Sequence, residues 1–583
     1  MQVIKKRAAV IQSIVAFSFL NRSSLAFVPT AFHFHTTTTL TSQIKLHDSF
    51  PKVHSKTSLN MNTDNDDADK KTQFNLVHSN DVEAVRNAPK LDGKRPTKMT
   101  TSTFLLTVMV GVPLWLTVAM PLTVVYQAGK KVFSVSSPED SDAVAETLVH
   151  QETFPETHEL KPLKDRTYDV VLLGGTGFTG RLAAMYLAEN YNKNIRWAIA
   201  GRSKDKLDKL LKELKGITGD SAKHDIDVIL VDTSKPSTLH ALANDSRCVI
   251  TTAGPFWKYG SNVVEFCARY GTNYVDITGE TGWNKEMIMK WDVKAQETGA
   301  KIVSLCGNDS IPWDMTYFKL AQMLRDDCKD EIAEVRCYDE MKGGFSGGTI
   351  DTALSFLENK YIQPRFDFDP YYKKVDGSKS RNKAKDISSQ FISKRNKSDG
   401  EEKWANPFVM SSVNAEVVKR SHALNDSLDG QALTYAESVV QVGFKEAFVT
   451  WFAPIFGVTA LLNPVTGFPM KKLLPKPGEG PREKDMKYGY LLVSGVGEGV
   501  KGSKVESELY FPSDPGYRDT ARMISEAGLC LALDSEKLPV QGGGFFSPSV
   551  AMGDALLQRL CSTGCKFASR VVATQDGKLH SKL

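Results

Sequence analysis

The residues best placed to do chemistry are three glycines, Gly175, Gly177 and Gly180, which stand in the order G-x-G-x-x-G after an apolar run. In a dinucleotide site the first glycine of this pattern makes a tight turn and the second lets a pyrophosphate approach the backbone. The third lets the following helix pack closely on the preceding strand. The pattern alone also fits an ordinary glycine-rich turn, so its neighbours have to decide between the two readings.

The flanking segments favour the dinucleotide site. Residues Val170 to Leu173 form a short apolar run typical of a buried parallel strand, and a helical pattern begins near Arg181. A second apolar strand, Ile195 to Ala200, follows at the interval of a βαβ unit. We therefore predict a bound dinucleotide whose phosphates rest on the amides at the start of that helix.

The turn after the second strand indicates which dinucleotide. An NAD-preferring site places an acid there for the ribose hydroxyls, but this chain has Arg202, whose guanidinium can pair with a 2′-phosphate. We expect NADP(H) to be preferred over NAD(H); a surface arginine without a ligand is the alternative. The expected cofactor-binding residues are Gly174, Gly175, Thr176, Gly177, Phe178, Thr179, Gly180, Arg202, Ser203, Asp232, Ala253, Gly254 and Pro255.

Hydride chemistry also needs a group that donates or accepts a proton. No Ser-xxx-Tyr-xxx-Lys arrangement is evident, so four candidate catalytic residues come from the turns after the later strands: Tyr259, Asp276, Glu280 and Asp309. A phenol, or a carboxylic acid with a raised pKa, could protonate a developing enolate. The alternative is structural: Tyr259 packs, and the acids cap helices or tie loops.

These residues must be positioned by a larger sheet. Further strands are predicted at Asp227 to Val231, Arg247 to Thr252, Asn273 to Ile277 and Lys301 to Leu305. Helical segments separate several of them, so we predict an α/β fold with a Rossmann-type, doubly wound parallel sheet over 165–325. Ligands collect at the carboxyl ends of such strands, where the candidate residues lie.

Composition bounds the remaining possibilities. The 583 residues, 41% hydrophobic, suffice for more than one domain. The 73 basic and 68 acidic residues leave a formal net charge of only +5, and no dense basic block suggests nucleic-acid binding. The eight cysteines are scattered without zinc-site spacing, so they are expected to be reduced, and no metal is expected.

The N-terminal part is typical of targeting and membrane attachment. Residues 1–62 combine a basic start, an apolar stretch and a Ser- and Thr-rich segment, which resembles a two-part plastid presequence; a plain secretory signal is the alternative. After a polar linker, 63–103, residues 104–126 carry no charge over a length that can span a bilayer. A buried hairpin is the alternative there. Residues 127–164 are expected to be a tether.

A second, mixed α+β substrate domain is predicted over 326–545, followed by a C-terminal helix and tail over 546–583. Within it, residues 447–468 are apolar and uncharged but interrupted by prolines. We expect this segment to contact one leaflet of a membrane, with a buried core hairpin as the alternative.

A series of motifs runs from about Tyr168 to the C-terminus: GGTGFTG, AGRS, TTAGPFWKYG, YVDITGE, SLCGNDSIPWDM, GGFSGGTIDT, SDPGYRDTARMISEAGLCLA and GGGFFSPSVAMGDALLQRL. In their order and spacing these motifs resemble a known family, the saccharopine dehydrogenase-like oxidoreductases, which include the trans-acting enoyl reductases of lipid biosynthesis. Two positions depart from the family pattern. Asn308 replaces an aromatic residue and Trp313 replaces a small one, so a pocket that they line would take a different substrate.

Taken together with Arg202 and the uncharged stretches, the resemblance implies a membrane-associated, NADPH-dependent oxidoreductase acting on an apolar lipid or isoprenoid-type substrate, with enoyl reduction in lipid or glycolipid synthesis as one such reaction. A non-catalytic, nucleotide-binding scaffold on a membrane or lipid droplet is the alternative. The expected partners are a lipid-like small molecule and a membrane, with a homodimer left open. The expected location is the plastid, with a lipid droplet or another endomembrane as the alternative.

Overall fold

We analysed a computed structural model of the chain. It describes residues 81–94, 160–191, 194–218, 225–343, 393–396, 402–408, 410–425, 433–450 and 479–574. The expected presequence 1–62 and the expected membrane span 104–126 lie outside these residues, as does nearly all of the tether.

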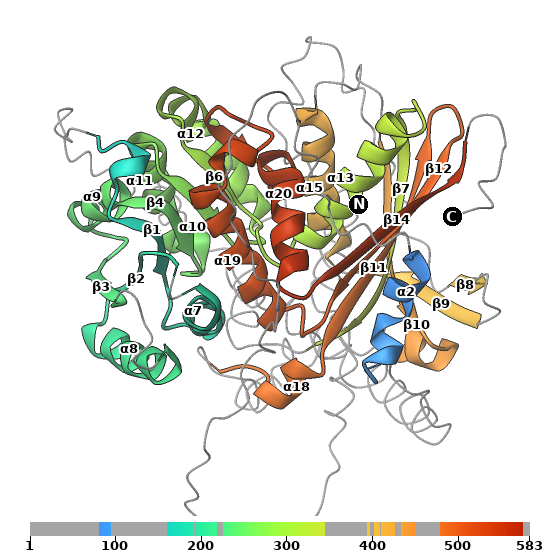
Figure 1. The fold of residues 1–583 in the computed structure, drawn as a ribbon, viewed down its shortest axis with the longest axis horizontal. Helices are drawn as coiled ribbons and strands as arrows, with labels where there is room; N and C mark the ends of the chain where they lie inside the picture. The colour runs from blue at the N-terminus through green and yellow to red at the C-terminus, as the bar shows by residue number, and fades with distance from the viewer. Residues whose placement is uncertain are drawn as a thin grey trace, which may run out of the picture.

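The first sheet is parallel throughout and has the strand order β13-β6-β5-β4-β1-β2-β3 (Figure 1). Its strands are β1 (Tyr168–Leu173), β2 (Trp197–Gly201), β3 (Asp227–Leu230), β4 (Ser246–Thr251), β5 (Asn273–Asp276), β6 (Lys301–Val303) and β13 (Gly544–Phe546). The Rossmann-type, doubly wound sheet predicted from the sequence is therefore confirmed, with six strands close to their expected positions.

Helices cover both faces of this sheet, which explains why β1 is an unbroken apolar run. Val170 and Leu172 enter the core shared with the second sheet, whereas Val171 and Leu173 enter a core on the opposite face. The helices that alternate with its strands are α7 (Phe178–Tyr191), α8 (Lys204–Thr218), α9 (Pro236–Asp245), α10 (Phe256–Tyr259), α11 (Ser261–Tyr270) and α12 (Thr281–Thr298).

The second sheet is mixed, with the order β14-β12-β11-β7-β10-β9-β8, and only β7 and β10 pair in parallel. Its strands are β7 (Ile332–Lys342), β8 (Ser393–Asn396), β9 (Glu402–Pro407), β10 (Thr434–Gln441), β11 (Tyr490–Gly499), β12 (Lys504–Phe511) and β14 (Lys566–Ala573). Short helical turns lie at η4 (Leu163–Asp165), α18 (Glu483–Lys487) and η7 (Ser535–Lys537).

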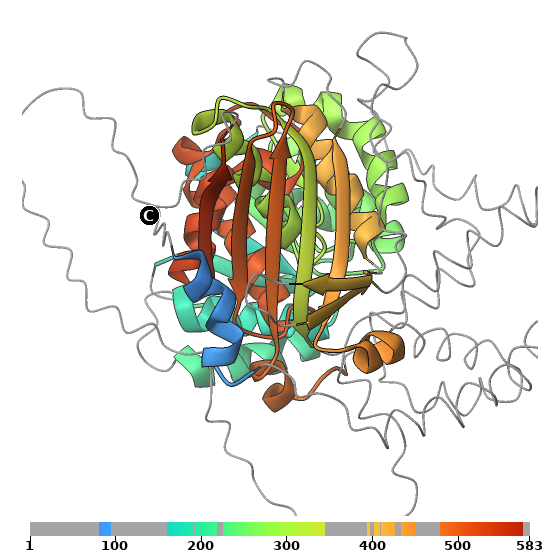
Figure 2. The same ribbon diagram turned by 90° about the vertical axis from the view of Figure 1, so that its right-hand side faces the viewer.

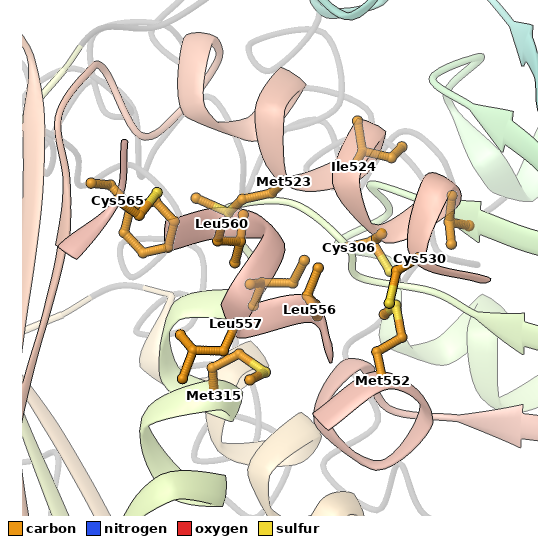
Figure 3. Close-up of a cluster of buried hydrophobic side chains, with 14 of the residues drawn as sticks. Cys306, Met315, Met523, Ile524, Cys530, Met552, Leu556, Leu557, Leu560 and Cys565 are labelled. Atoms are coloured by element: carbon orange, nitrogen blue, oxygen red, sulfur yellow. The ribbon is translucent and has the colours of Figure 1, made fainter. Parts of the chain in front are cut away.

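Four helices fill the space between the two sheets (Figure 1): α13 (Ile311–Asp326), α15 (Ser411–Leu424), α19 (Arg518–Leu533) and α20 (Pro548–Ser562). α13 packs on β7, β11 and β12, while α19 packs on β1, β4 and β5. Figure 3 shows the core where these helices meet, with Met315 of α13, Ile524 of α19 and Leu556 of α20 all fully buried. One continuous core thus fixes the two sheets relative to each other.

The boundary expected at 545 does not separate the two sheets. α19 lies within 326–545 and β13 begins there, yet they cover and extend the first sheet, and β14, expected to be tail, is an edge strand of the second. The reason is that α19 and β13 find their partners in the first sheet more than two hundred residues earlier in the chain. β13, for instance, pairs with β6. Such pairings leave no local signal in the sequence.

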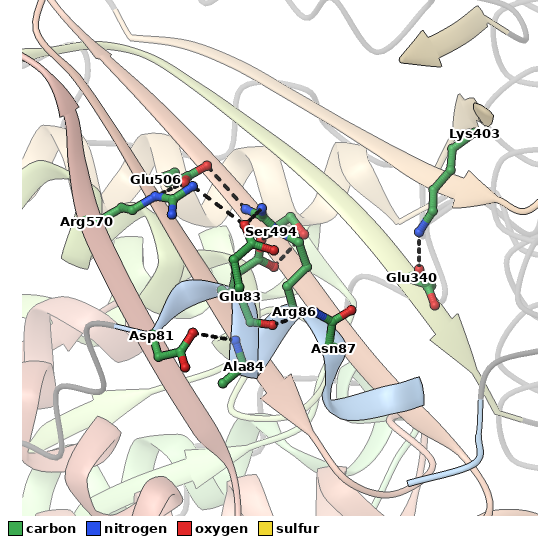
Figure 4. Close-up of polar contacts among 11 residues, drawn as sticks. Asp81, Glu83, Ala84, Arg86, Asn87, Glu340, Lys403, Ser494, Glu506 and Arg570 are labelled. Atoms are coloured by element: carbon green, nitrogen blue, oxygen red, sulfur yellow. Dashed lines mark hydrogen bonds and ion pairs between the residues drawn. The ribbon is translucent and has the colours of Figure 1, made fainter. Parts of the chain in front are cut away.

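Part of the expected polar linker 63–103 is also structured. α2 (Val82–Leu91) lies on the outer face of the second sheet (Figure 2), where Val82, Val85 and Ala88 are buried at helical spacing. Arg86 holds it there through ion pairs with Glu506 and Glu508 of β12 (Figure 4). The segment was predicted to be a linker because its composition is polar, and the three apolar residues that form the buried face of α2 are separated by polar ones.

Among the described residues, no helix combines the length and apolarity needed to cross a membrane. The apolar segment 447–468 is described only over its first four residues, of which Ala447 and Val449 are buried in protein. Its expected membrane contact, and that of residues 104–126, fall outside the part of the chain that the structure describes.

Candidate active site

The glycine turn between β1 and α7 has the geometry that its sequence predicts. Gly174 has φ +88°, a value that favours glycine, and its N–H donates to Ala200 O at 3.1 Å. A Cβ on Gly180 would lie 2.2 Å from Gly174 O and 2.5 Å from Thr252 Oγ1. Gly175 is buried, and a Cβ there would lie 3.3 Å from Leu210. These contacts fix the turn against β1, β4 and α8.

Gly177 differs from these neighbours because it faces open space. A Cβ there would meet no protein atom closer than Gly174 O at 3.4 Å, and both Thr176 and Gly177 are exposed. The first-turn amides of α7, from Phe178, Thr179 and Gly180, have no helical partners. A pyrophosphate therefore fits here: the cradle is open at the one glycine that a phosphate has to approach.

Phe178 has a partly different role from its neighbours in the turn. Its ring packs edge-on against Tyr517 with the centroids 5.2 Å apart, and a Cβ on Gly480 would overlap it. The phenyl ring thus anchors the turn to α19 and to the segment before α18, while its backbone amide stays at the helix start.

Arg202 and Tyr259 lie together beyond the carboxyl end of β2. The Arg202 guanidinium sits over the Tyr259 ring, 5.3 Å from its centroid, and both Arg202 and Ser203 are exposed. Hydrogen bonds from the side chain and the N–H of Ser234 are the main cause of a lowered pKa at Asp232. The positive charge of nearby Arg202 also lowers it. Tyr259 therefore lies beside the exposed Arg202, at the end of the short helix α10 whose first amides donate to Glu280.

The loop after β4 packs beside the glycine turn. Thr252 Oγ1 donates to Gly174 O at 3.2 Å, and Ala253 N donates to Thr251 Oγ1 at 3.2 Å. Gly254 is exposed, and the Gly254–Pro255 peptide bond is cis. The structure thus brings the expected Ala253 to Pro255 segment to the edge where the glycine turn lies.

Glu280 ties two loops of this edge together. Its carboxylate accepts hydrogen bonds from Phe256 N at 3.0 Å and Trp257 N at 2.7 Å. Burial raises its pKa to about 7, against the lowering effect of these two amides. Both oxygens are thus bound by the backbone at the start of α10, which agrees with the alternative that this acid caps a helix and ties a loop.

Asp276 is also fully engaged. One oxygen accepts from Thr278 N and Leu305 N, and the other accepts from Tyr274 Oη and Ser304 Oγ, at 2.8 to 3.2 Å. Burial raises its pKa to about 6, and the four donors act against that rise. This carboxyl joins the ends of β5 and β6 and leaves no acceptor for a ligand.

Asp309 is the exception among the candidate acids. It follows β6, the residue is partly exposed, and its Oδ1 is buried with no hydrogen-bond partner among the described residues. Burial alone raises the pKa of Asp309 to about 7, because no donor or positive charge stabilises its ionised form. An acid in this state exchanges a proton near neutral pH.

The second sheet supplies two acids that the sequence analysis missed. Asp339 of β7 and Glu437 of β10 are fully buried neighbours, and burial raises the pKa of each. The charge of Asp309 adds to the rise at Glu437, so the three carboxyls lie in one region. The available signal was an acid at an inward-facing position of the strand, between the apolar residues Tyr435 and Val439 that share its face.

Taken together, the fold and this edge define an oxidoreductase of the class that binds a dinucleotide on a Rossmann sheet. The family model of the saccharopine dehydrogenase NADP binding domain matches residues 170–303, from β1 through β6. A protein of Mycobacterium tuberculosis named as a trans-acting enoyl reductase is 34% identical over 431 residues, covering 70% of this chain and 99% of its own length. The trans-acting enoyl reductase of Mycobacterium ulcerans is 31% identical over 419 residues, covering 68% and 97%.

The chain belongs to the saccharopine dehydrogenase-like oxidoreductases, and it is an NAD(P)-dependent oxidoreductase. Among solved structures, apo saccharopine dehydrogenase from Saccharomyces cerevisiae is 13% identical, with a TM-score of 0.40 over 69% of this chain and 99% of its own. That likeness is too distant to bear on the site.

Proposed function

We propose that this protein is an NADPH-dependent reductase that saturates a carbon–carbon double bond next to a carbonyl in an apolar substrate, with Asp309 as the proton donor. The observation that carries the proposal is the unpartnered, buried Oδ1 of Asp309. Both carboxylate oxygens of Asp276 and of Glu280 accept hydrogen bonds from the protein, whereas Oδ1 of Asp309 is available to a reactant.

The chemistry needs one hydride and one proton. NADPH held at the glycine turn around Gly177 would supply the hydride to the β-carbon, which calls for a proton at the α-carbon. Asp309 in its protonated form gives its proton to the α-carbon and becomes a carboxylate. A pKa of about 7 keeps a sizeable protonated fraction at neutral pH while leaving the acid strong enough to donate.

The preference for NADPH over NADH rests on Arg202. Its guanidinium is exposed, stacks on Tyr259 and lies just past β2, where a 2′-phosphate would be placed. The names of the relatives support enoyl reduction, and the uncharged stretches 104–126 and 447–468 in the sequence support an apolar substrate and attachment to a membrane. We include a plastid location in the proposal because residues 1–62 have the composition of a two-part presequence.

The cofactor half of the proposal has a direct test in Gly177→Val. The new side chain meets open space in the free protein but would occupy the position of the pyrophosphate. We expect NADPH binding to be lost by titration calorimetry while the thermal midpoint stays close to that of the unsubstituted chain. Equal NADPH affinity in both proteins would remove the basis of the cofactor site.

The reaction itself is tested by incubating the full chain with NADPH and an extracted lipid pool, then following nicotinamide absorbance and product mass. We expect NADPH loss matched by a lipid heavier by two hydrogens, and neither with Asp309→Asn. Asp327→Asn, at an exposed position after α13, is the matched control and should behave as the unsubstituted protein. Cofactor binding without turnover on any lipid pool would favour the scaffold alternative.

A further inference from the structure

A second group of unpartnered polar atoms lies beside Asp309, on the inner face of the second sheet. Asn406 Oδ1 and Asn414 Oδ1 are buried and have no hydrogen-bond partner among the described residues. Both side chains are at most 1% exposed. Leaving a buried acceptor unpaired costs about 1–3 kcal/mol, and native proteins do so rarely. Two such acceptors in one place indicate a missing partner that donates hydrogen bonds.

Strand register shows that these atoms converge. Val439 of β10 pairs directly with Asn406 of β9 on one side and with Asp339 of β7 on the other. Side chains at paired positions share a face of the sheet, and Glu437, two residues before Val439, shares it too. Asn414 of α15 reaches the same place, because its Nδ2 donates to Glu437 Oε1 at 3.0 Å.

The cluster is acidic in composition but carries little charge. Asp339 and Glu437 are close enough to share a proton, and their burial holds the pKa of each well above its usual range. Lys403 of β9 points to the opposite face, where it pairs with Glu340 (Figure 4). A site of amide oxygens and a proton-sharing acid pair suits neutral donors better than a cation, whose desolvation it would not offset.

Two aromatic residues form one wall of the cluster. Trp313 Nε1 donates to Asp339 Oδ1 at 3.0 Å, and its indole stacks on Phe408 with centroids 5.5 Å apart. Trp313 is one of the two departures from the family pattern; the other, Asn308, adjoins Asp309 and also has a buried, unpartnered Oδ1. Both departures therefore lie where the two groups of unpartnered acceptors meet.

We propose that the acceptors on β7, β9 and α15, with Asn406 and Asn414 at their centre, bind a hydroxyl-bearing end of the substrate. The inference rests on the proposed function, since it places that end beside the proton donor Asp309. A hydroxyl can donate to an amide oxygen and accept from a protonated carboxyl at once. No group of three acidic, His or Cys side chains in the described residues is arranged to hold a metal ion. A hydroxylated lipid or isoprenoid is thus the substrate class.

The test uses three probes that share a chain length and differ at the polar end: 1-octanoylglycerol, methyl octanoate and octylamine. Binding to the full chain is read by hydrogen–deuterium exchange of the peptides that cover β9, β10 and α15, which requires no turnover. We expect 1-octanoylglycerol to protect these peptides, with methyl octanoate and octylamine at least about tenfold weaker, because neither presents neutral hydroxyls.

Asn406→Leu removes one acceptor and should weaken 1-octanoylglycerol about fivefold to tenfold, the effect of one lost hydrogen bond. Asn414→Ala gives the same reading if the leucine variant does not fold. Asn87→Leu, exposed on α2 across the sheet, is the control and should change nothing. Equal protection by all three probes, tighter octylamine binding, or no protection because only water fills the cluster would each overturn the inference.

These outcomes separate the inference from the proposed function. If 1-octanoylglycerol protects these peptides but the protein oxidises no NADPH, the proposed hydroxyl-binding site would stand and the proposed reductase activity would be wrong. If the protein reduces a lipid that carries no hydroxyl with NADPH, and Asn406→Leu loses none of this activity, the proposed reductase activity would stand and the hydroxyl-binding site would be wrong.

Discussion

The acids at the carboxyl edge of the first sheet and those facing the second sheet differ in what they bind. Asp276 and Glu280 accept all their hydrogen bonds from the protein and join β5, β6 and α10. Asp309 is partly exposed, yet its buried Oδ1 has no partner among the described residues. Burial raises the pKa values in both places. Hydrogen-bond satisfaction, rather than pKa alone, separates acids that support the fold from acids available to a ligand.

The largest expected effect is on turnover. Asp309→Asn keeps the shape of the side chain but has no proton of suitable pKa, so kcat should fall about 10²–10⁴-fold. NADPH affinity should stay within about twofold, since Asp309 lies away from the phosphate turn. The measurement is steady-state kinetics on the lipid identified by product mass. A fall in affinity with kcat unchanged would make Asp309 a binding residue instead.

The second effect is on stability, and it contrasts two alanine substitutions. Asp276→Ala leaves Thr278 N and Leu305 N without their acceptor, so the free energy of unfolding should fall by about 3 kcal/mol. Asp309→Ala removes an acid without hydrogen-bond partners in the described chain and should cost less than about 1 kcal/mol. Urea unfolding at pH 7 measures both, and equal losses would erase the distinction between the two groups of acids.

A smaller effect is expected on cofactor selectivity, at Arg202. Arg202→Glu should weaken NADPH about tenfold to a hundredfold, because a charge-assisted pair with the 2′-phosphate contributes about 1.5–3 kcal/mol. NADH has no such phosphate and should change by less than about threefold. Titration of both cofactors decides, with Lys206→Glu, also exposed but one turn into α8, as the control. Parallel losses for both cofactors would remove Arg202 as the selector.

The sequence predicted the first sheet well because its signals are local. Apolar runs such as Val170 to Leu173, glycines with fixed tasks and strand–helix alternation all act within about thirty residues. The candidate acids were placed at the correct edge for the same reason. The sequence did not show which of these acids support the fold and which could donate a proton, because partners of Asp276 such as Ser304 come from the segment that follows another strand.

The second sheet and its acceptors were beyond the reach of local patterns. Glu437 lies 128 residues after Asp309, and Asn406 meets Asp339 only through the pairing of three strands. α2 was hidden in polar composition, and α19 and β13 join the first sheet across the whole second domain. Long-range pairing, which no spacing encodes, assembled the region where the departures Asn308 and Trp313 lie.

The state of the Asp309 carboxyl is the central claim, and its pH linkage tests it without any substrate. Folding raises its pKa from 3.8 to about 7, so the folded protein holds this proton more tightly than the unfolded chain. The stability it adds is fully present below pH 3.8 and is lost as pH rises through about 7.

The measurement is the free energy of unfolding of the unsubstituted protein and Asp309→Asn, by urea at intervals from pH 4 to pH 8. Asparagine does not titrate, so the unsubstituted protein should lose about 4 kcal/mol relative to the variant across this range. Two curves that stay parallel from pH 4 to pH 8 would show that Asp309 is ionised throughout, which contradicts its role as the proton donor.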